Sequence, residues 1–124
     1  MALHTETDIY RAIFDLAGEA VEVVLQMRRD VKPVLGRTIL DNCLAMELDV
    51  RAANMAPVES REPHLLKLLE RLATVETVVR MCRDKRFIKT PAYARLITHT
   101  QSVGRQANGW RKHHAGDGTQ RQLI

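Results

Sequence analysis

Aromatic residues are scarce in this sequence: one Trp, two Tyr and two Phe make up 4% of its 124 residues. The hydrophobic fraction is still 45%, because Leu, Val, Ala, Ile and Met are plentiful. Ala, Leu and Met favour helices, whereas strands are enriched in aromatic side chains. The composition therefore favours a helical fold, in one domain that buries about two-thirds of its unfolded surface.

Cysteines and long apolar runs are also lacking. Cys43 and Cys82 lie in no CxxC or Cys/His cluster, so we expect two buried free thiols rather than a zinc site or a disulfide framework. No apolar run approaches the ~20 residues of a membrane span, and the N-terminus is polar and acidic. We therefore expect a cytoplasmic protein with no membrane partner.

Catalytic motifs are missing as well. The five histidines form no HxxxH pair, and the sequence contains no ExxH motif, no phosphate-binding glycine loop and no nucleophile elbow. We expect a protein that is not an enzyme and that binds no metal or cofactor.

Apolar residues recur instead at alternating steps of three and four, the spacing of one helix face, in four segments. Pro33, Pro63 and Pro91 mark helix starts, because proline is tolerated in a first turn. The predicted helices span about 6–29, 33–55, 62–83 and 91–112. The expected core residues are Ile9, Ile13, Leu16, Ala20, Val23 and Met27, then Ile39, Cys43, Met46, Val50 and Ala53, then Leu65, Leu68, Leu72, Val75, Val79 and Cys82, and finally Tyr93, Leu96, Thr100, Val103, Ala107 and Trp110.

Four helices of similar length with short connections pack most simply up-down-up-down. We therefore predict an all-α, antiparallel four-helix bundle over residues 1–114. The polar, glycine-containing segment 115–124 is predicted to be a flexible C-terminal tail.

Positive charge is expected to collect at one end of this bundle, because the first and third connections share an end. The cations flanking them are Arg28, Arg29, Lys32, Arg37, Arg83, Lys85, Arg86 and Lys89. Only Asp30 and Asp84 oppose these eight, so the local charge is eight minus two, or +6, against +4 for the whole chain. Such a surface fits the phosphates of nucleic acid.

A second interpretation of these cations stays open, because helix C-termini and solvated loops favour positive charge in any case. Few aromatic residues lie among them, so we expect neither base stacking nor sequence-specific recognition.

The helices carry more apolar residues than one core stripe needs: Tyr10, Phe14, Leu40, Leu44, Leu48, Leu66 and Leu69. Exposed apolar patches usually mark interfaces, so we expect a homo-oligomer. The alternative is a broad stripe that faces the core.

Two motifs resemble a known family. Val34-Leu35-Gly36-Arg37-Thr38-Ile39-Leu40 opens the second helix, and Val103-Gly104-Arg105-Gln106-Ala107-Asn108-Gly109-Trp110 lies in the fourth. Together with Arg80-Met81-Cys82-Arg83-Asp84 they resemble the four-helix-bundle family of Avd, the accessory protein of diversity-generating retroelements, and of the 23S ribosomal RNA intervening-sequence proteins. The resemblance covers about residues 8–113 and is closer to Avd, because the Ser-Asn-Ile-Ala-Glu-Gly motif of the other branch is absent.

This resemblance implies a homopentameric ring of bundles with a basic surface, which binds nucleic acid and a reverse transcriptase. Within the second motif, Gly104 and Gly109 each cost about 1 kcal/mol relative to alanine in a helix, so we expect another backbone to approach them closely. Trp110 is expected to anchor the core near one end of the bundle.

The leading hypothesis is thus a non-catalytic, oligomeric accessory protein that binds nucleic acid. A structural or protein-protein interaction module with no nucleic-acid role is the alternative.

Overall fold

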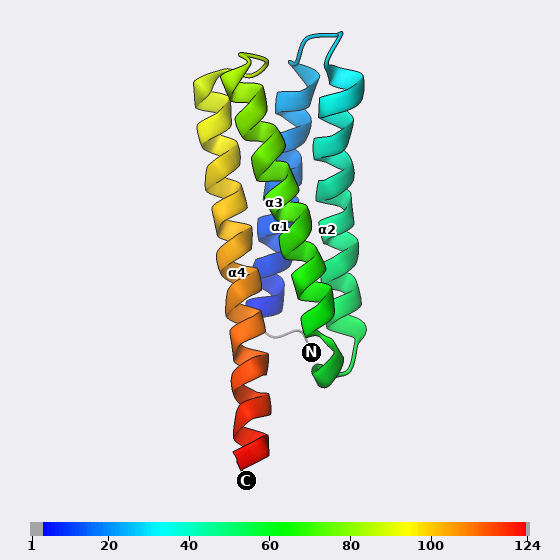
Figure 1. Cartoon of the computed structure of the whole chain (residues 1–124), viewed down its shortest axis with the longest axis vertical. Helices are drawn as coiled ribbons and strands as arrows, with labels where there is room; N and C mark the ends of the chain where they lie inside the picture. Colours follow the sequence, from blue (N-terminus) through cyan, green and yellow to red (C-terminus); the bar gives the residue numbers. More distant parts are fainter. Residues whose placement is uncertain (1–3, 124) are drawn as a thin grey trace.

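A computed structural model describes the backbone of residues 4–123 and the side chains of residues 8–112. Its four long helices are α1 (His4–Leu25), α2 (Arg37–Met55), α3 (Glu62–Asp84) and α4 (Thr90–Leu123). They run alternately up and down (Figure 1), and no strand occurs in the described backbone. The predicted all-α, antiparallel four-helix bundle is therefore confirmed.

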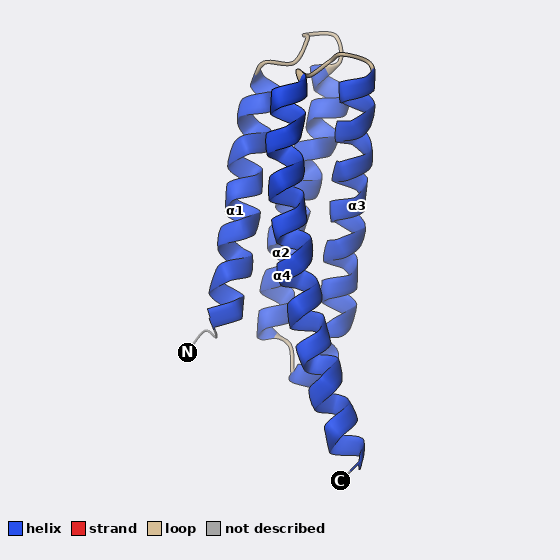
Figure 2. Ribbon diagram, turned by 90° about the vertical axis from the view of Figure 1, so that its left-hand side faces the viewer, coloured by secondary structure: helices blue, strands red, loops and turns tan. Residues whose placement is uncertain are grey.

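Each helix contacts its two neighbours around the bundle: α1 and α3 both pack against α2 and α4 (Figure 2). The predicted core stripes meet in one contiguous cluster of buried residues. Tyr93, which packs against this cluster, is half-buried, and every other residue of the predicted stripes is buried. The periodicity of the sequence therefore located the core correctly, because it marks which side of each helix is removed from water.

Two polar side chains lie in the core region, and both have partners. The Thr100 hydroxyl lies 3.1 Å from a carboxylate oxygen of Glu76, across the interface between α3 and α4. The Arg71 guanidinium donates to the buried Asp49 carboxylate at 3.1 Å, which joins α3 to α2. Buried polar groups are costly only when unpaired, so both contacts are compatible with the packed core.

The first connection differs from the prediction, which placed helices at 6–29 and 33–55. α1 ends at Leu25, because its last turn tightens: the Gln26 and Met27 N–H groups bond to carbonyls only three residues back. A π-helical segment, η1 (Lys32–Gly36), then precedes α2, and the Arg37 N–H donates to the carbonyl of Lys32, five residues back. Pro33 in the first turn of η1 has no N–H, so it disturbs no hydrogen bond there.

The other boundaries agree more closely, with one exception. A 3-10 turn, η2 (Val58–Ser60), separates α2 from α3, and α3 matches its predicted span to within one residue. The fourth helix was predicted to end at 112, but α4 continues to Leu123 and extends beyond the other three helices (Figure 1). Each further residue of a growing helix adds one hydrogen bond. The two glycines of segment 115–124 therefore do not end α4, and this segment contains no proline that would. The side chains of the predicted 115–124 tail lie outside the described residues.

Gly104 and Gly109 of the fourth helix have no close backbone neighbour among the described residues of their own chain. A Cβ added at Gly104 would meet only the Leu72 side chain, at 3.4 Å, and one added at Gly109 would meet nothing within 4 Å. Approach by the backbone of a second copy of the chain therefore stays a prediction. Within the chain, the close approach lies elsewhere, at Gly36, where a Cβ would stand 2.7 Å from Cγ1 of Val24.

Trp110 and the two cysteines agree with prediction. Trp110 is buried near the end of the bundle, with the Arg61 guanidinium 5.6 Å from its ring centroid. Cys43 and Cys82 are buried free thiols, and burial raises the pKa of Cys43 to about 11.

Candidate functional site

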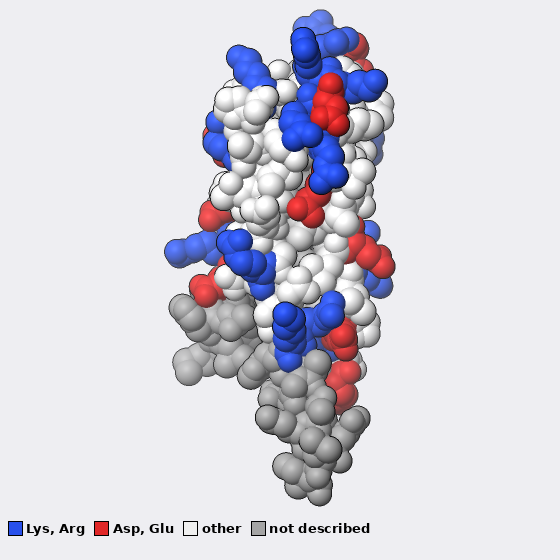
Figure 3. Space-filling view, turned by 60° about the vertical axis from the view of Figure 1, so that its left-hand side comes forward, with Lys and Arg blue, Asp and Glu red and all other residues white. Residues whose placement is uncertain are grey.

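The first and third connections of the bundle lie at the same end (Figure 1). The Arg28 guanidinium, just after α1, lies 5.4 Å from the centroid of the Phe87 ring, just after α3, which is a cation–π contact. Figure 3 shows Lys and Arg side chains gathered at this end with few acidic ones among them. We call this surface the basic end, and it comprises Arg28, Arg29, Lys32, Arg37, Arg83, Lys85, Arg86 and Lys89.

The end of α3 fixes the shape of the third connection. The Phe87 N–H donates to the Cys82 carbonyl at 2.8 Å, and the Arg86 N–H donates to the Arg83 carbonyl at 3.0 Å. These two bonds form a Schellman motif, which satisfies the last carbonyls of a helix and needs one residue in the left-handed region. Arg86 takes that position with φ of 61°. Its side chain is exposed beside the loop, where glycine is the usual residue.

One cation of the first connection has a structural role. The Lys32 ammonium donates to the carbonyl of Leu25, the last residue of α1, at 3.0 Å. A cation at a helix C-terminus is favourable because the last carbonyls carry partial negative charge. The capping interpretation of the sequence is therefore correct for Lys32.

Three further cations form ion pairs with acids close in sequence: Arg28 with Asp30, Arg37 with Asp41, and Arg83 with Asp84, at N–O distances of 3.1, 3.5 and 2.9 Å. The hydrogen bond from Arg28 lowers the pKa of Asp30, so this acid stays charged. The predicted charge of +6 omits Asp41; with it, eight cations face three acids, and the local charge is +5.

The remaining four cations of the basic end are Arg29, Lys85, Arg86 and Lys89. All four are exposed, and none forms an ion pair within the described part of the chain. One of them, Arg29, lies in the connection after α1, whereas the other three lie in the loop between α3 and α4. That loop therefore supplies most of the uncompensated charge.

Aromatic rings lie closer to these cations than the sequence suggested. The Arg83 guanidinium stands 4.3 Å from the Tyr93 ring centroid, and Arg28 lies over Phe87. Such contacts hold a guanidinium in place while leaving its outer N–H groups free to donate. Phe87 and Tyr93 thus contact arginines of the basic end, whereas the expected lack of base stacking and of sequence-specific recognition stays a prediction.

A pocket of about 320 Å³ opens between the end of α1 and the third connection. Three of the predicted binding residues, Arg28, Arg86 and Lys89, line this pocket. Arg95 from α4 lines it too, although it was not among the predicted binding residues. Arg95 follows Pro91 by four residues and therefore lies on the same helix face, a spacing that was available in the sequence. The Arg95 side chain also pairs with Glu19 of α1 at 3.3 Å.

A second surface is apolar and lies between α1 and α2. Phe14 and Leu44 are 76% and 62% exposed there, and they line a groove of about 330 Å³ together with Val21 and Leu40. We call this surface the apolar groove. Of the apolar residues predicted outside the core stripes, Tyr10, Leu40 and Leu69 pack partly against the core, whereas Phe14, Leu44, Leu48 and Leu66 are exposed.

Within the described residues, no three His, Cys, Asp or Glu side chains are grouped so that they would hold a metal ion. No helix in that part of the chain combines the length and apolar character needed to cross a membrane.

No protein-family model matches the chain, and no curated protein matches it either. The resemblance to the Avd family therefore stays a prediction that depends on the motif residues themselves.

Proposed function

We propose that this chain is a non-catalytic accessory protein that binds nucleic acid through the basic end and works as an oligomer. One observation carries the proposal: cations from two connections distant in sequence share one surface, and four of them have no acid partner in the described chain. Phosphate groups are the natural counterions of such a surface, because each contact releases condensed cations from the nucleic acid.

The oligomeric part of the proposal depends on the apolar groove. Exposed apolar side chains that lie together favour burial against another surface. The Avd resemblance implies a pentamer, in which five chains of +4 would total +20. Repeated basic ends would strengthen binding to one strand through multivalency. The same resemblance makes a reverse transcriptase the candidate protein partner.

The experiment measures binding of labelled single-stranded RNA and DNA across salt concentrations. Four uncompensated cations predict that the logarithm of affinity falls with the logarithm of salt with a slope of about −3. The charge-reversed variant Lys85→Glu, Arg86→Glu, Lys89→Glu should bind at least tenfold more weakly. These three side chains are exposed and unpaired, so their reversal leaves the core untouched.

A matched control reverses three exposed cations of the opposite half, Lys67, Arg105 and Lys112. Both variants have the same net charge, so a difference between them reports the location of the charge rather than its total. The absence of binding at low salt, or equal losses in the two variants, would contradict the proposal.

The alternative function, a protein-protein interaction module, is favoured by the apolar groove. In that case the charge-reversed variant of the basic end should keep its protein partner, and binding should depend on Phe14 and Leu44 instead. An adjacent gene for a reverse transcriptase would identify the partner to test first.

A further inference from the structure

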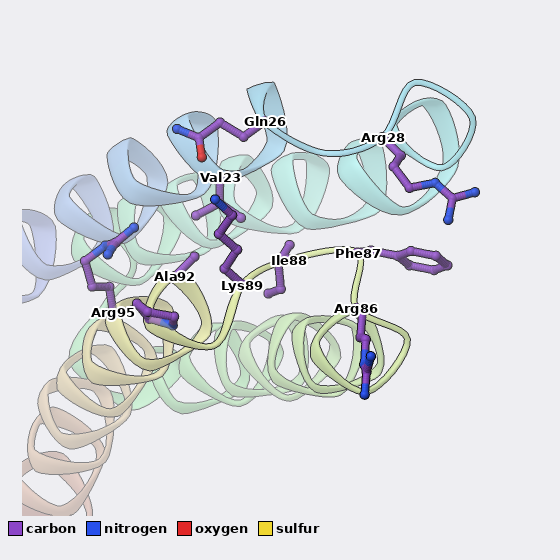
Figure 4. A pocket seen from close by; sticks show the side chains of 10 residues that line it. Val23, Gln26, Arg28, Arg86, Phe87, Ile88, Lys89, Ala92 and Arg95 are labelled. Atoms are coloured by element: carbon purple, nitrogen blue, oxygen red, sulfur yellow. The ribbon is translucent and has the colours of Figure 1, made fainter.

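The pocket at the basic end combines two surfaces of different chemistry. Its floor is apolar, because Val23, Ile88 and Ala92 line it, and the half-buried Phe87 adds an aromatic side chain at the end where Arg28 lies (Figure 4). Its rim is cationic and contains no acidic residue among the described lining. A surface that bound only phosphates would need the rim but not the floor.

The rim cations are spread along the pocket rather than gathered at one point. Figure 4 shows Arg28 and Arg86 toward one end, Arg95 toward the other, and Lys89 between them, extending from the third connection toward Val23 of α1. Arg28 and Arg95 already have acid partners, Asp30 and Glu19. Arg86 and Lys89 have none within the described residues, so they are the cations available to a ligand.

The size of the pocket limits its occupant. Pockets for small organic ligands have volumes of about 300–1,000 Å³, so about 320 Å³ lies at the lower limit. That volume suits one nucleotide.

We propose that this pocket holds one unpaired nucleotide of a nucleic-acid strand, and that the protein therefore prefers single strands to duplexes. The inference rests on the proposed function and specifies its ligand. The base enters the pocket over the apolar floor, with Phe87 at one end, while Lys89 and Arg86 contact the phosphates on either side. In a duplex the bases are stacked and paired, so only the backbone reaches the rim and the floor stays empty.

The test compares a labelled single strand of deoxythymidines with a DNA duplex of the same length, by fluorescence anisotropy at fixed salt. We expect the native protein to bind the single strand about tenfold more tightly, since contact of one base with an aromatic ring has an effect of this order. Equal or weaker affinity for the single strand would overturn this inference and leave the proposed function intact. Failure to bind either probe would overturn both.

Ala92→Leu fills the pocket without changing its charge, and should remove the preference while duplex affinity stays unchanged. The matched control is Ala94→Leu, which adds the same atoms to the same helix turn at an exposed position outside the pocket. Phe87→Leu provides a second variant, since it keeps an apolar side chain but removes the ring. A single-strand preference that survives in both folded variants would refute the assignment of the pocket.

Discussion

The hydrogen bond from the Phe87 N–H to the Cys82 carbonyl, 2.8 Å long, closes the C-terminus of α3 and turns the chain toward α4. The turn requires left-handed backbone at the residue before Phe87, and that residue is Arg86, with φ of 61°. A side chain in this region costs about 1–2 kcal/mol relative to glycine. The chain thus places a cation where local backbone energetics favour glycine, and the cation lines the pocket at the basic end.

Replacement of Arg86 by glycine should therefore separate stability from binding. We expect Arg86→Gly to unfold at the same denaturant concentration as the native protein or higher, with a gain of up to about 1 kcal/mol, because the steric cost disappears. Nucleic-acid affinity should fall, and the salt slope should become shallower by about one. Denaturant unfolding and salt-dependent anisotropy measure the two effects.

Arg105→Gln serves as the control for Arg86→Gly, because it removes one exposed cation of α4 far from the basic end. It should change neither the slope nor the affinity appreciably. A stable Arg86→Gly protein with native affinity would show that this residue contacts no phosphate.

Two glycine substitutions should have opposite effects on stability. Gly109→Ala should raise the free energy of unfolding by about 0.5–1 kcal/mol, because alanine favours the helix and its Cβ meets no atom within 4 Å. Gly36→Ala should lower it, because its Cβ would stand 2.7 Å from Cγ1 of the buried Val24. Thermal unfolding of both variants checks the prediction, and a destabilised Gly109→Ala protein would indicate that a neighbouring molecule packs at this position.

The apolar groove should control assembly. Phe14→Glu combined with Leu44→Glu should leave the helical content unchanged, since both side chains are largely exposed, but should shift the light-scattering mass toward 14.1 kDa. Met55→Glu is the control, because Met55 is 80% exposed and lies outside the groove. A native protein that is already monomeric at micromolar concentration would contradict the proposed oligomer.

The Cys43 thiol should make stability depend on alkaline pH. Burial raises the pKa of this thiol to about 11 from an ordinary value of 9.0, so the folded state favours the protonated form. Above pH 9 the unfolded thiol ionises first, and stability should fall by up to about 1.4 kcal/mol per pH unit until about pH 11. Below pH 9 the thiol is protonated in both the folded and the unfolded state, so its ionisation causes no loss of stability there.

The measurement compares the native protein with Cys43→Ala by urea unfolding between pH 7 and 10.5. The variant should be less stable at pH 7, because it leaves a small cavity, and the difference should shrink as the pH rises. A difference that stays constant across this range would mean that Cys43 does not ionise on unfolding.

The core could be predicted from sequence because burial repeats with the helix period. A residue such as Leu72 is identified by its spacing from Leu68 and Val75, without knowledge of its contacts. The ends of the helices were harder to locate. The tightened last turn of α1 and the Lys32 contact to Leu25 depend on the three-dimensional course of the connection, which no periodicity encodes.

The location of the basic end could also be predicted from sequence, but its detailed contacts could not. Antiparallel topology brings the first and third connections together, so counting charges was enough to indicate the basic end. The count could not show that Asp41 pairs with Arg37, or that Arg95 joins the rim of a pocket. Nor could the number of aromatic residues show that Phe87 and Tyr93 both contact arginines of the basic end.

The sequence by itself determined four amphipathic helices, their antiparallel order and the pooling of positive charge at one end, because these follow from periodicity and from the shortness of the connections. Only the tertiary structure decided which cations remain unpaired, where an apolar floor meets a cationic rim, and which apolar side chains stay exposed. Those features depend on the rotation of each helix about its axis and on side-chain direction, and both are set by packing between segments distant in the chain.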